Sequence, residues 1–226
     1  TMLTRSEEDH IKAVHALLQD GASAGTKDLA EKLNIKSSSV TVMLKKLAEK
    51  GLLKHEPYYG VKLTTKGKAA ALKLIRKHRL WETFLVQRLG FGWDEVHEVA
   101  EQLEHVRSEK LTESLATYLG DPAFDPHGYP IPDREGRMPD RDTKPLTECG
   151  IGTWVRIAAV KDGTDALLNL LDRKGISIGM RMEVTGLQEF DGTVEVSGEK
   201  GKHIALSAKV AEHLLVELVP AGKKKK

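Results

Sequence analysis

Apolar residues recur every three or four positions through the first fifty residues of the chain, which is the spacing of amphipathic helices. This pattern predicts three short helices, over residues 6–21, 26–34 and 37–51. Ser6 and Thr26 are the expected N-caps of the first two helices, because a hydroxyl there accepts a hydrogen bond from a free backbone N–H. The chain is therefore predicted to begin with a small helical domain.

Two short runs with the character of β-strands follow the third helix, over residues 52–56 and 61–64. The aromatic stretch Pro57-Tyr58-Tyr59-Gly60 lies between them as a turn. Three helices followed by a two-stranded wing predict a winged helix-turn-helix, in which the third helix is the recognition element.

The third helix has an apolar face and a small, polar outer face. Small hydroxyl side chains permit close approach to base edges, and lysines reach phosphates, so this outer face is suited to DNA. The predicted DNA-contacting residues, including one on the second helix and one at the wing tip, are Thr26, Ser37, Ser38, Ser39, Thr41, Lys45, Lys46 and Tyr59.

The helical pattern continues beyond the wing. A long helix is predicted over residues 68–89, and a second helix opens at Trp93 or Asp94 and ends near Gly120. Six of the eight prolines then lie between residues 122 and 145, which excludes a regular element and predicts an ordered crossing loop.

From Gly152 the pattern changes to an alternation of apolar and polar residues, which predicts short strands. One short helix, over residues 165–174 and closed by Gly175, interrupts them. Four or five strands in such a short stretch indicate a small barrel, so the fold class is mainly α with a small β domain. The predicted strands cover residues 153–157, 180–184, 193–196 and 203–206.

Charge is segregated along the chain, although the formal net charge is only +2. Residues 1–80 hold 16 Lys and Arg against 8 Asp and Glu, whereas residues 81–143 hold 6 against 14. A basic beginning and an acidic middle predict an anionic partner at one end and a cationic ligand at the other. Nucleic acid together with a metal ion satisfies both.

The composition excludes several other classes of protein. With 40% hydrophobic and 30% charged residues the chain is typical of globular proteins, and 226 residues are enough for two or three domains. No apolar run approaches the roughly 20 residues that cross a bilayer, and no signal peptide is recognisable, so a cytoplasmic protein without a membrane partner is expected. The single cysteine, Cys149, excludes an intrachain disulfide framework.

The acidic middle contains imidazoles and carboxylates at helical spacing. On one predicted helix they fall within an arc of roughly 100°. On the preceding helix, His78 is followed four residues later by Glu82, which is the same spacing as that of His97 and Glu101. Such ligands suit a divalent transition metal better than calcium or magnesium. The residues of the main run are His97, Glu101, Glu104 and His105.

Two other classes of function are compatible with parts of this pattern. His97-Glu98-Val99-Ala100-Glu101 differs by one residue from the helix motif of zinc hydrolases, but the second imidazole is missing. A metal-independent adaptor that binds peptides through its barrel is the other alternative. We expect a protein that is not an enzyme.

The order of these elements resembles the diphtheria-toxin-repressor family, and most closely its manganese-responsive regulators. The resemblance covers about residues 4–219 and implies a metal-dependent transcriptional regulator that binds operator DNA as a homodimer and represses metal-uptake genes. The phrases that carry it are Arg76-Lys77-His78-Arg79-Leu80, Leu103-Glu104-His105-Val106 and Asp125-Pro126-His127-Gly128-Tyr129-Pro130-Ile131-Pro132.

The resemblance also implies the domain organisation. The expected domains are a winged helix-turn-helix (1–70), a helical metal-binding and dimerisation domain that includes the proline-rich loop (71–145), an SH3-like, FeoA-like barrel (146–220) and a lysine-rich tail (221–226).

A regulatory metal site is implied at Asp9 of the first helix together with Glu101, Glu104 and His105. Iron-responsive relatives have Met and Cys at the positions of Asp9 and Glu101. Oxygen ligands there favour harder ions, so Mn²⁺ is the first choice and Fe²⁺ the second, with Zn²⁺ or Co²⁺ possible in vitro. Lys12 stands where some two-metal manganese regulators have Glu, so a closely spaced pair of ions is not expected.

An ancillary metal site is implied as well, and the barrel domain contributes an acceptor to it. Asp162 is the first choice for that acceptor and Asp165 the second. We expect His127, in the proline-rich loop, to make a structural hydrogen bond rather than to bind metal. The other ancillary ligands are His78, Glu82 and His97.

Overall fold

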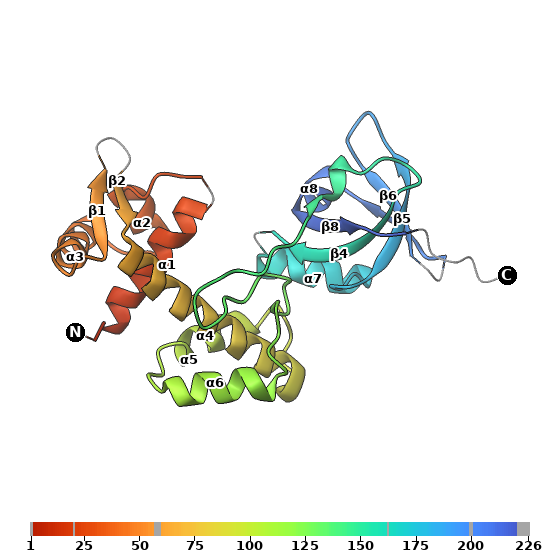
Figure 1. The fold of residues 1–226 in the computed structure, drawn as a ribbon. Helices are drawn as coiled ribbons and strands as arrows, with labels where there is room; N and C mark the ends of the chain where they lie inside the picture. Colours follow the sequence, from red (N-terminus) through yellow and green to blue (C-terminus); the bar gives the residue numbers. More distant parts are fainter. Residues whose placement is uncertain (1, 20, 57–59, 162, 199–200, 221–226) are drawn as a thin grey trace. The chain divides into compact units, whose positions relative to one another are not determined.

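The computed structural model describes residues 2–19, 21–56, 60–161, 163–198 and 201–220 (Figure 1). The chain forms two compact units. The first unit comprises Thr1–Trp81, Ala100–Asp121 and Ile131–Met138, and the second comprises Glu82–Val99, Pro122–Pro130 and Pro139–Lys226.

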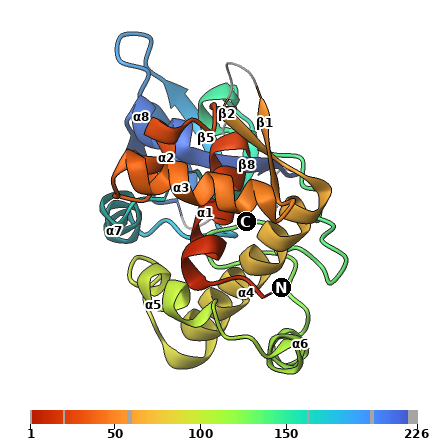
Figure 2. The same cartoon turned by 90° about the vertical axis from the view of Figure 1, so that its left-hand side faces the viewer.

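A three-helix cluster and a hairpin begin the first unit, as the sequence predicts. Figure 2 shows α2 and α3 lying side by side, with α1 and the hairpin next to them. Leu29, Val40 and Leu47 are fully buried between these elements. The elements are α1 (Arg5–Gln19), α2 (Thr26–Lys32), α3 (Ser37–Glu49), β1 (Leu53–Glu56) and β2 (Gly60–Leu63), with the two strands antiparallel.

The start of α1 is capped by Thr4 and not by Ser6, which lies inside the helix and is exposed. The Glu7 N–H donates to Thr4 Oγ1 at 3.3 Å, and the Thr4 N–H donates to Glu7 Oε2 at 2.8 Å. This reciprocal pair is a capping box, shifted two residues from the expected cap. Burial alone would raise the pKa of Glu7, but hydrogen bonds from Lys50, the Thr4 backbone and Lys46 lower it to about 2.

The prediction that Thr26 caps α2 is also wrong by one residue. Gly25 is the N-cap, and its N–H donates to Asp28 Oδ2 at 3.2 Å. The carboxylate three residues into the helix satisfies the backbone donor, so the cap needs no hydroxyl of its own.

The single helix predicted from Trp93 to Gly120 is two helices, α5 (Val96–Leu103) and α6 (Glu109–Tyr118), which follow α4 (Thr65–Leu89). Residues 104–108 form a turn between them. Ser108 is the N-cap of α6, where its Oγ accepts from the Leu111 N–H at 3.2 Å. In the sequence, the helical spacing of side chains continues through residues 104–108. Ser108 is therefore the sequence signal that marks the break between α5 and α6.

A bent antiparallel sheet forms the core of the second unit (Figure 1). Its strand order is β3-β8-β4-β5-β6-β7, and bulges after Ile157 and Val184 bend it. The predicted strands and the helix that ends at Gly175 (φ +71°) are confirmed, while β3, β8 and α8 are additional. The elements are β3 (Lys144–Pro145), β4 (Trp154–Val160), α7 (Asp165–Lys174), β5 (Arg181–Leu187), β6 (Val194–Gly198), β7 (His203–Leu206), α8 (Ala208–His213) and β8 (Leu214–Leu218), with a 3₁₀ turn at Leu146–Glu148.

The proline-rich stretch is ordered, as expected. Asp125 Oδ1 accepts from the N–H groups of His127 and Tyr129 at 2.8 and 2.9 Å, which folds the loop into a tight turn. The Val160 N–H donates to the His127 carbonyl at 3.0 Å, so this turn is bonded to β4. Among the described residues, no helix is both long enough and apolar enough to cross a membrane.

Gly128 makes this turn possible, and we expect Gly128→Ala to destabilise the second unit by about 2 kcal/mol or more. Its φ is +88°, and a Cβ would lie 2.0 Å from the Ala158 carbonyl oxygen. Gly179→Ala is the matched control, since Gly179 has φ +84° and nothing within 4 Å of its Cβ position. Chemical denaturation of both variants checks this, and equal losses of stability would contradict it.

Candidate metal centre

The turn after α5 and the first turns of α1 bring imidazole and carboxylate groups together in the first unit. His105 Nε2 lies 3.1 Å from Asp9 Oδ1 and 3.8 Å from Glu104 Oε1. One ligand atom from each of these three residues lies within 4.8 Å of the others. Glu104 and His105 therefore lie in a turn, and not on the face of a helix as their spacing suggested.

Glu8 determines how His105 is presented. His105 Nδ1 lies 2.6 Å from Glu8 Oε2, so Nδ1–H donates to this carboxylate and Nε2 is directed at Asp9. A metal-binding histidine typically donates its other ring N–H to a carboxylate in this manner. The donor set of imidazole nitrogen and carboxylate oxygens fits a divalent transition metal. Glu8 was not identified from the sequence, because only its contact with a distant turn reveals it.

Glu104 is the most buried carboxylate of the cluster, with a side chain 1% exposed. Lys12 Nζ donates to its Oε2 at 2.6 Å, and His78 Nδ1 contacts the same oxygen. Burial would raise the pKa of Glu104, but the hydrogen bond from His78 and the charge of Lys12 lower it. Glu104 is thus held in its ionised form inside the first unit. His78, predicted as an ancillary ligand, is here a partner of Glu104.

The pKa of Asp9 is shifted in the opposite direction, upward. Burial, and the neighbouring charge of Glu104, raise its pKa, although His105 and Arg5 oppose this. The carboxylate of Asp9 is therefore at an energetic disadvantage when the cluster holds only its own side chains. Since a metal ligand must be deprotonated, a cation bound there would favour the ionised form.

Glu101, the fourth predicted ligand of the regulatory site, lies on the last turn of α5. Its side chain is 51% exposed, and its Oε1 is 3.9 Å from Lys12 Nζ. The ammonium group of Lys12 thus lies between the carboxylates of Glu101 and Glu104. The assignment of Glu101 as a ligand stays a prediction.

A second group of possible ligands lies in the second unit, where Glu82, Asp125 and His127 are all buried. His127 makes the expected structural hydrogen bond, with Nε2 2.6 Å from the Trp93 carbonyl oxygen. Its Nδ1 is 3.8 Å from Glu82 Oε2. Burial lowers the pKa of His127, but Glu82 and Asp125 outweigh it and raise the value.

The predicted ancillary ligands are partly brought together. Within the second unit His97 Nδ1 lies 3.2 Å from Glu82 Oε1, and His78 precedes Glu82 by one turn on α4. Asp162 lies outside the described residues, and Asp165 is the first residue of α7. The hydrogen bond from the Val160 N–H to the His127 carbonyl places the end of β4 next to the group formed by Glu82, Asp125 and His127.

The predicted DNA-contacting residues of α3 are all exposed, as a recognition helix requires. Thr41 Oγ1 donates to the Ser37 carbonyl at 3.0 Å, so this hydroxyl is oriented along the helix. Val42, which the sequence did not single out, is 69% exposed on the same helix. Thr26 is the partly exposed first residue of α2, and Tyr59 lies outside the described residues. The exposed residues are Ser37, Ser38, Ser39, Thr41, Lys45 and Lys46.

Comparison with known proteins covers almost the whole chain. Residues 2–61 match the family model "Iron dependent repressor, N-terminal DNA binding domain", residues 64–133 match "Iron dependent repressor, metal binding and dimerisation domain", and residues 144–218 match "FeoA domain".

Both curated proteins and solved structures are similar to it. The iron-dependent repressor IdeR of Mycobacterium leprae (strain TN) is 29% identical over 96% of this chain and 99% of its own length. The HTH-type transcriptional regulator MntR of Lysinibacillus sphaericus (strain C3-41) is 38% identical over 51% of this chain and 82% of its own. A manganese-dependent transcriptional repressor solved with manganese has a TM-score of 0.82 and 35% identity, over 94% of this chain and 100% of that one.

Helix α1 belongs to the winged helix and also carries Asp9, one of the possible metal ligands. This combination defines a class of DNA-binding proteins that respond to a metal ion. The chain belongs to the diphtheria-toxin-repressor family of metal-dependent transcriptional repressors, in the branch of the manganese regulators. The predicted family and fold class are confirmed, including the FeoA-like C-terminal domain. The family consists of DNA-binding repressors, so the prediction of a protein that is not an enzyme is confirmed and the hydrolase alternative has no support.

We expect Glu8→Ala to weaken the affinity for Mn²⁺ by about 10- to 100-fold, the range measured when partners of metal-binding histidines are removed. Without Glu8, the ring of His105 loses the acceptor that fixes its orientation. Glu31→Ala removes an exposed carboxylate from α2 and serves as the control. Calorimetric titration with Mn²⁺ measures both variants, and an unchanged affinity in Glu8→Ala would show that Glu8 does not orient a ligand.

Proposed function

We propose that this protein is a Mn²⁺-dependent repressor that binds operator DNA, with Fe²⁺ as the second candidate for the regulatory metal. The observation that carries the proposal is the convergence of Asp9, on the first helix of the DNA-binding domain, with Glu104 and His105. The similar solved repressor was determined with manganese, which supports the choice of ion.

The ligand chemistry supports the same choice. The cluster offers carboxylate oxygens and an imidazole nitrogen, and Cys149 belongs to the core of the second unit. Ligand sets without sulfur favour harder divalent ions, although affinity alone still ranks Zn²⁺ and Co²⁺ above Mn²⁺. We propose Asp9, Glu101, Glu104 and His105 as the regulatory ligands.

The proposed regulatory mechanism starts from the placement of the ligands. Asp9 belongs to α1, whereas Glu104 and His105 belong to the turn after α5, and like charges on Asp9 and Glu104 oppose their close approach. A divalent cation, when bound, supplies the positive charge that offsets the repulsion. If the arrangement with α1 held against the turn is the one that fits DNA, metal and DNA must each increase the affinity for the other.

Residues 64–133 match a metal-binding and dimerisation domain, so we propose a homodimer that presents two recognition helices about one turn of DNA apart or a multiple of it. We further propose a cytoplasmic location, where operator DNA is found. Asp162 is proposed as the barrel's contribution to an ancillary metal site, whose other ligands are His78, Glu82 and His97.

We expect Asp9→Ala to abolish the increase in DNA affinity that Mn²⁺ produces, while the helical circular-dichroism signal stays unchanged. The variant removes a ligand that α1 supplies, and Asp9 is only partly buried, so the fold tolerates its loss. Duplex DNA is titrated in the presence of Mn²⁺ and in the presence of a chelator, with Glu31→Ala as control. If Asp9→Ala responds to Mn²⁺ like the unaltered protein, the site assignment is wrong.

We expect Lys45→Ala to weaken binding to all duplexes alike and to reduce the salt dependence of binding. Each lost phosphate contact lowers the slope of log K against log salt by about 0.9. Lys45 is exposed on α3, and Lys209→Ala, an exposed lysine on α8, is the control. Fluorescence anisotropy at several salt concentrations tests this, and a preserved slope would exclude a phosphate contact by Lys45.

A further inference from the structure

The N-terminal part of α1 carries three consecutive carboxylates that contact different parts of the first unit. Glu8 and Asp9 contact His105, in the turn after α5. Glu7 contacts α3, the recognition helix. One turn of helix therefore connects the candidate metal ligands to the element that reads DNA.

The contact of Glu7 with α3 is buried and consists of several bonds. The Glu7 side chain is 0% exposed, and its Oε1 accepts from Lys50 Nζ at 2.6 Å and lies 3.0 Å from Lys46 Nζ. Its Oε2 accepts from the Thr4 N–H at 2.8 Å. Lys50 is the C-cap residue of α3, so Glu7 joins the N-terminal end of α1 to the C-terminal end of α3.

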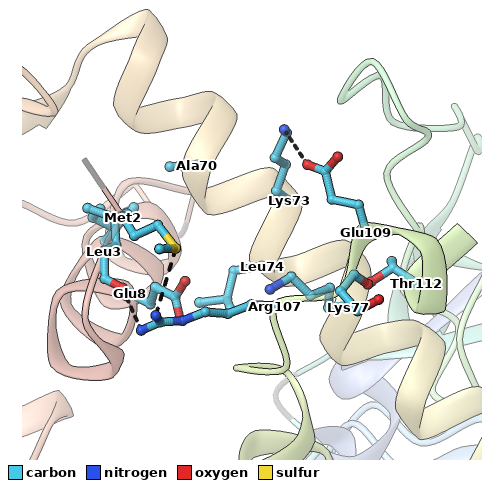
Figure 3. A pocket seen from close by; sticks show the side chains of 12 residues that line it. Met2, Leu3, Glu8, Ala70, Lys73, Leu74, Lys77, Arg107, Glu109 and Thr112 are labelled. Atoms are coloured by element: carbon cyan, nitrogen blue, oxygen red, sulfur yellow. Dashed lines mark hydrogen bonds and ion pairs between the residues drawn. The ribbon is translucent and has the colours of Figure 1, made fainter.

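The segment that carries His105 also contacts the residues that precede α1. Arg107 donates to the Leu3 carbonyl oxygen at 3.3 Å (Figure 3). Lys77, on α4, donates to the Glu104 carbonyl at 3.0 Å and so fixes the backbone of this segment. The turn after α5 is thereby bonded both to α4 and to the residues that precede α1.

Apolar packing also joins α1 to α3. Ile11 and Val14 share a core with residues of α3, and hydrophobic contact has no preferred direction. A carboxylate that accepts from ammonium groups on one side and from a backbone N–H on the other is directional. Among the described contacts of α1, the bonds of Glu7 are therefore suited to transmit a displacement.

We infer that Glu7 is the positioning residue that couples the metal centre to the recognition helix, through its bonds to Lys50 and Lys46. This inference rests on the proposed metal-dependent repressor function. Lys46 is also a predicted phosphate contact, and the bond to Lys50 keeps Glu7 attached to α3 when Lys46 turns to DNA.

The test separates metal binding from its effect on DNA binding. Glu7→Gln retains the size of the side chain and removes its charge, and Lys50→Gln removes the main partner without touching α1. Glu49→Gln, an exposed carboxylate beside Lys50 on α3, is the matched control. For each variant, calorimetry measures Mn²⁺ affinity without DNA, and anisotropy measures DNA affinity with saturating Mn²⁺ and with chelator.

We expect the ratio of DNA affinities with and without Mn²⁺ to fall by about tenfold or more in Glu7→Gln and Lys50→Gln, a loss within the usual range of coupling between sites. Mn²⁺ affinity without DNA should change by less than about twofold, since Glu7 is not a proposed ligand. The control should match the unaltered protein in all three measurements.

Two results would overturn the inference. One is an unchanged affinity ratio, and the other is an equal loss of DNA affinity with and without Mn²⁺, which a merely structural role would produce. If Glu7→Gln does not fold, Lys50→Gln decides by the same criteria. A failure of the proposed function is distinguishable, because the unaltered protein would then show no dependence of DNA binding on Mn²⁺.

Discussion

A carboxylate that is buried in a protein has to be matched by positive charge, and the first unit is arranged around one such group. The side chain of Glu104 is 1% exposed. Its two partners come from separate elements, since Lys12 belongs to α1 and His78 to α4. Three segments that lie far apart in the sequence thus meet because an ionised group cannot be left alone in the interior.

The two cationic partners of Glu104 contact only one of its carboxylate oxygens. Lys12 and His78 both contact Oε2, whereas Oε1 is directed to His105 and shares this region with Asp9 and Glu8. Burial is the largest cause of the raised pKa of Asp9, and the charge of Glu104 adds to it. A small cation bound among Asp9, Glu104 and His105 would favour the ionised form of Asp9, which is the behaviour that a metal sensor requires.

The sequence predicted the elements well where one period of apolar residues continued without interruption, as in α3 and in the strands from β4 to β7. It failed at Glu104 and His105, because the spacing of side chains stays helical through residues 104–108 although the backbone does not. Ser108, a favoured N-cap, was the local sign of the break. Spacing gives the face on which side chains would lie in a helix, and it does not show whether the helix is present.

The contacts of the site were less predictable than its ligands. The residue types and the resemblance to a family identified Asp9, Glu104 and His105, whose proximity the structure shows. Glu8 and the role of His78 were missed, because each depends on a partner about 97 or 26 residues away along the chain. Such pairings come from tertiary packing, which a single sequence does not encode in any local pattern.

The position of these groups on α1 determines what kind of sensor the protein can be. Ile11 and Val14 bury one face of α1 in the core of the first unit, and Glu8 and Asp9 lie on the same helix. A site already neutral without metal would gain little from a cation, and its binding would not favour one position of α1 over another. In the proposed mechanism the free energy of metal binding depends on where α1 lies, because Asp9 belongs to α1 while Glu104 and His105 belong to the turn after α5. A cation bound there would offset the cost of keeping the partly buried Asp9 ionised beside Glu104.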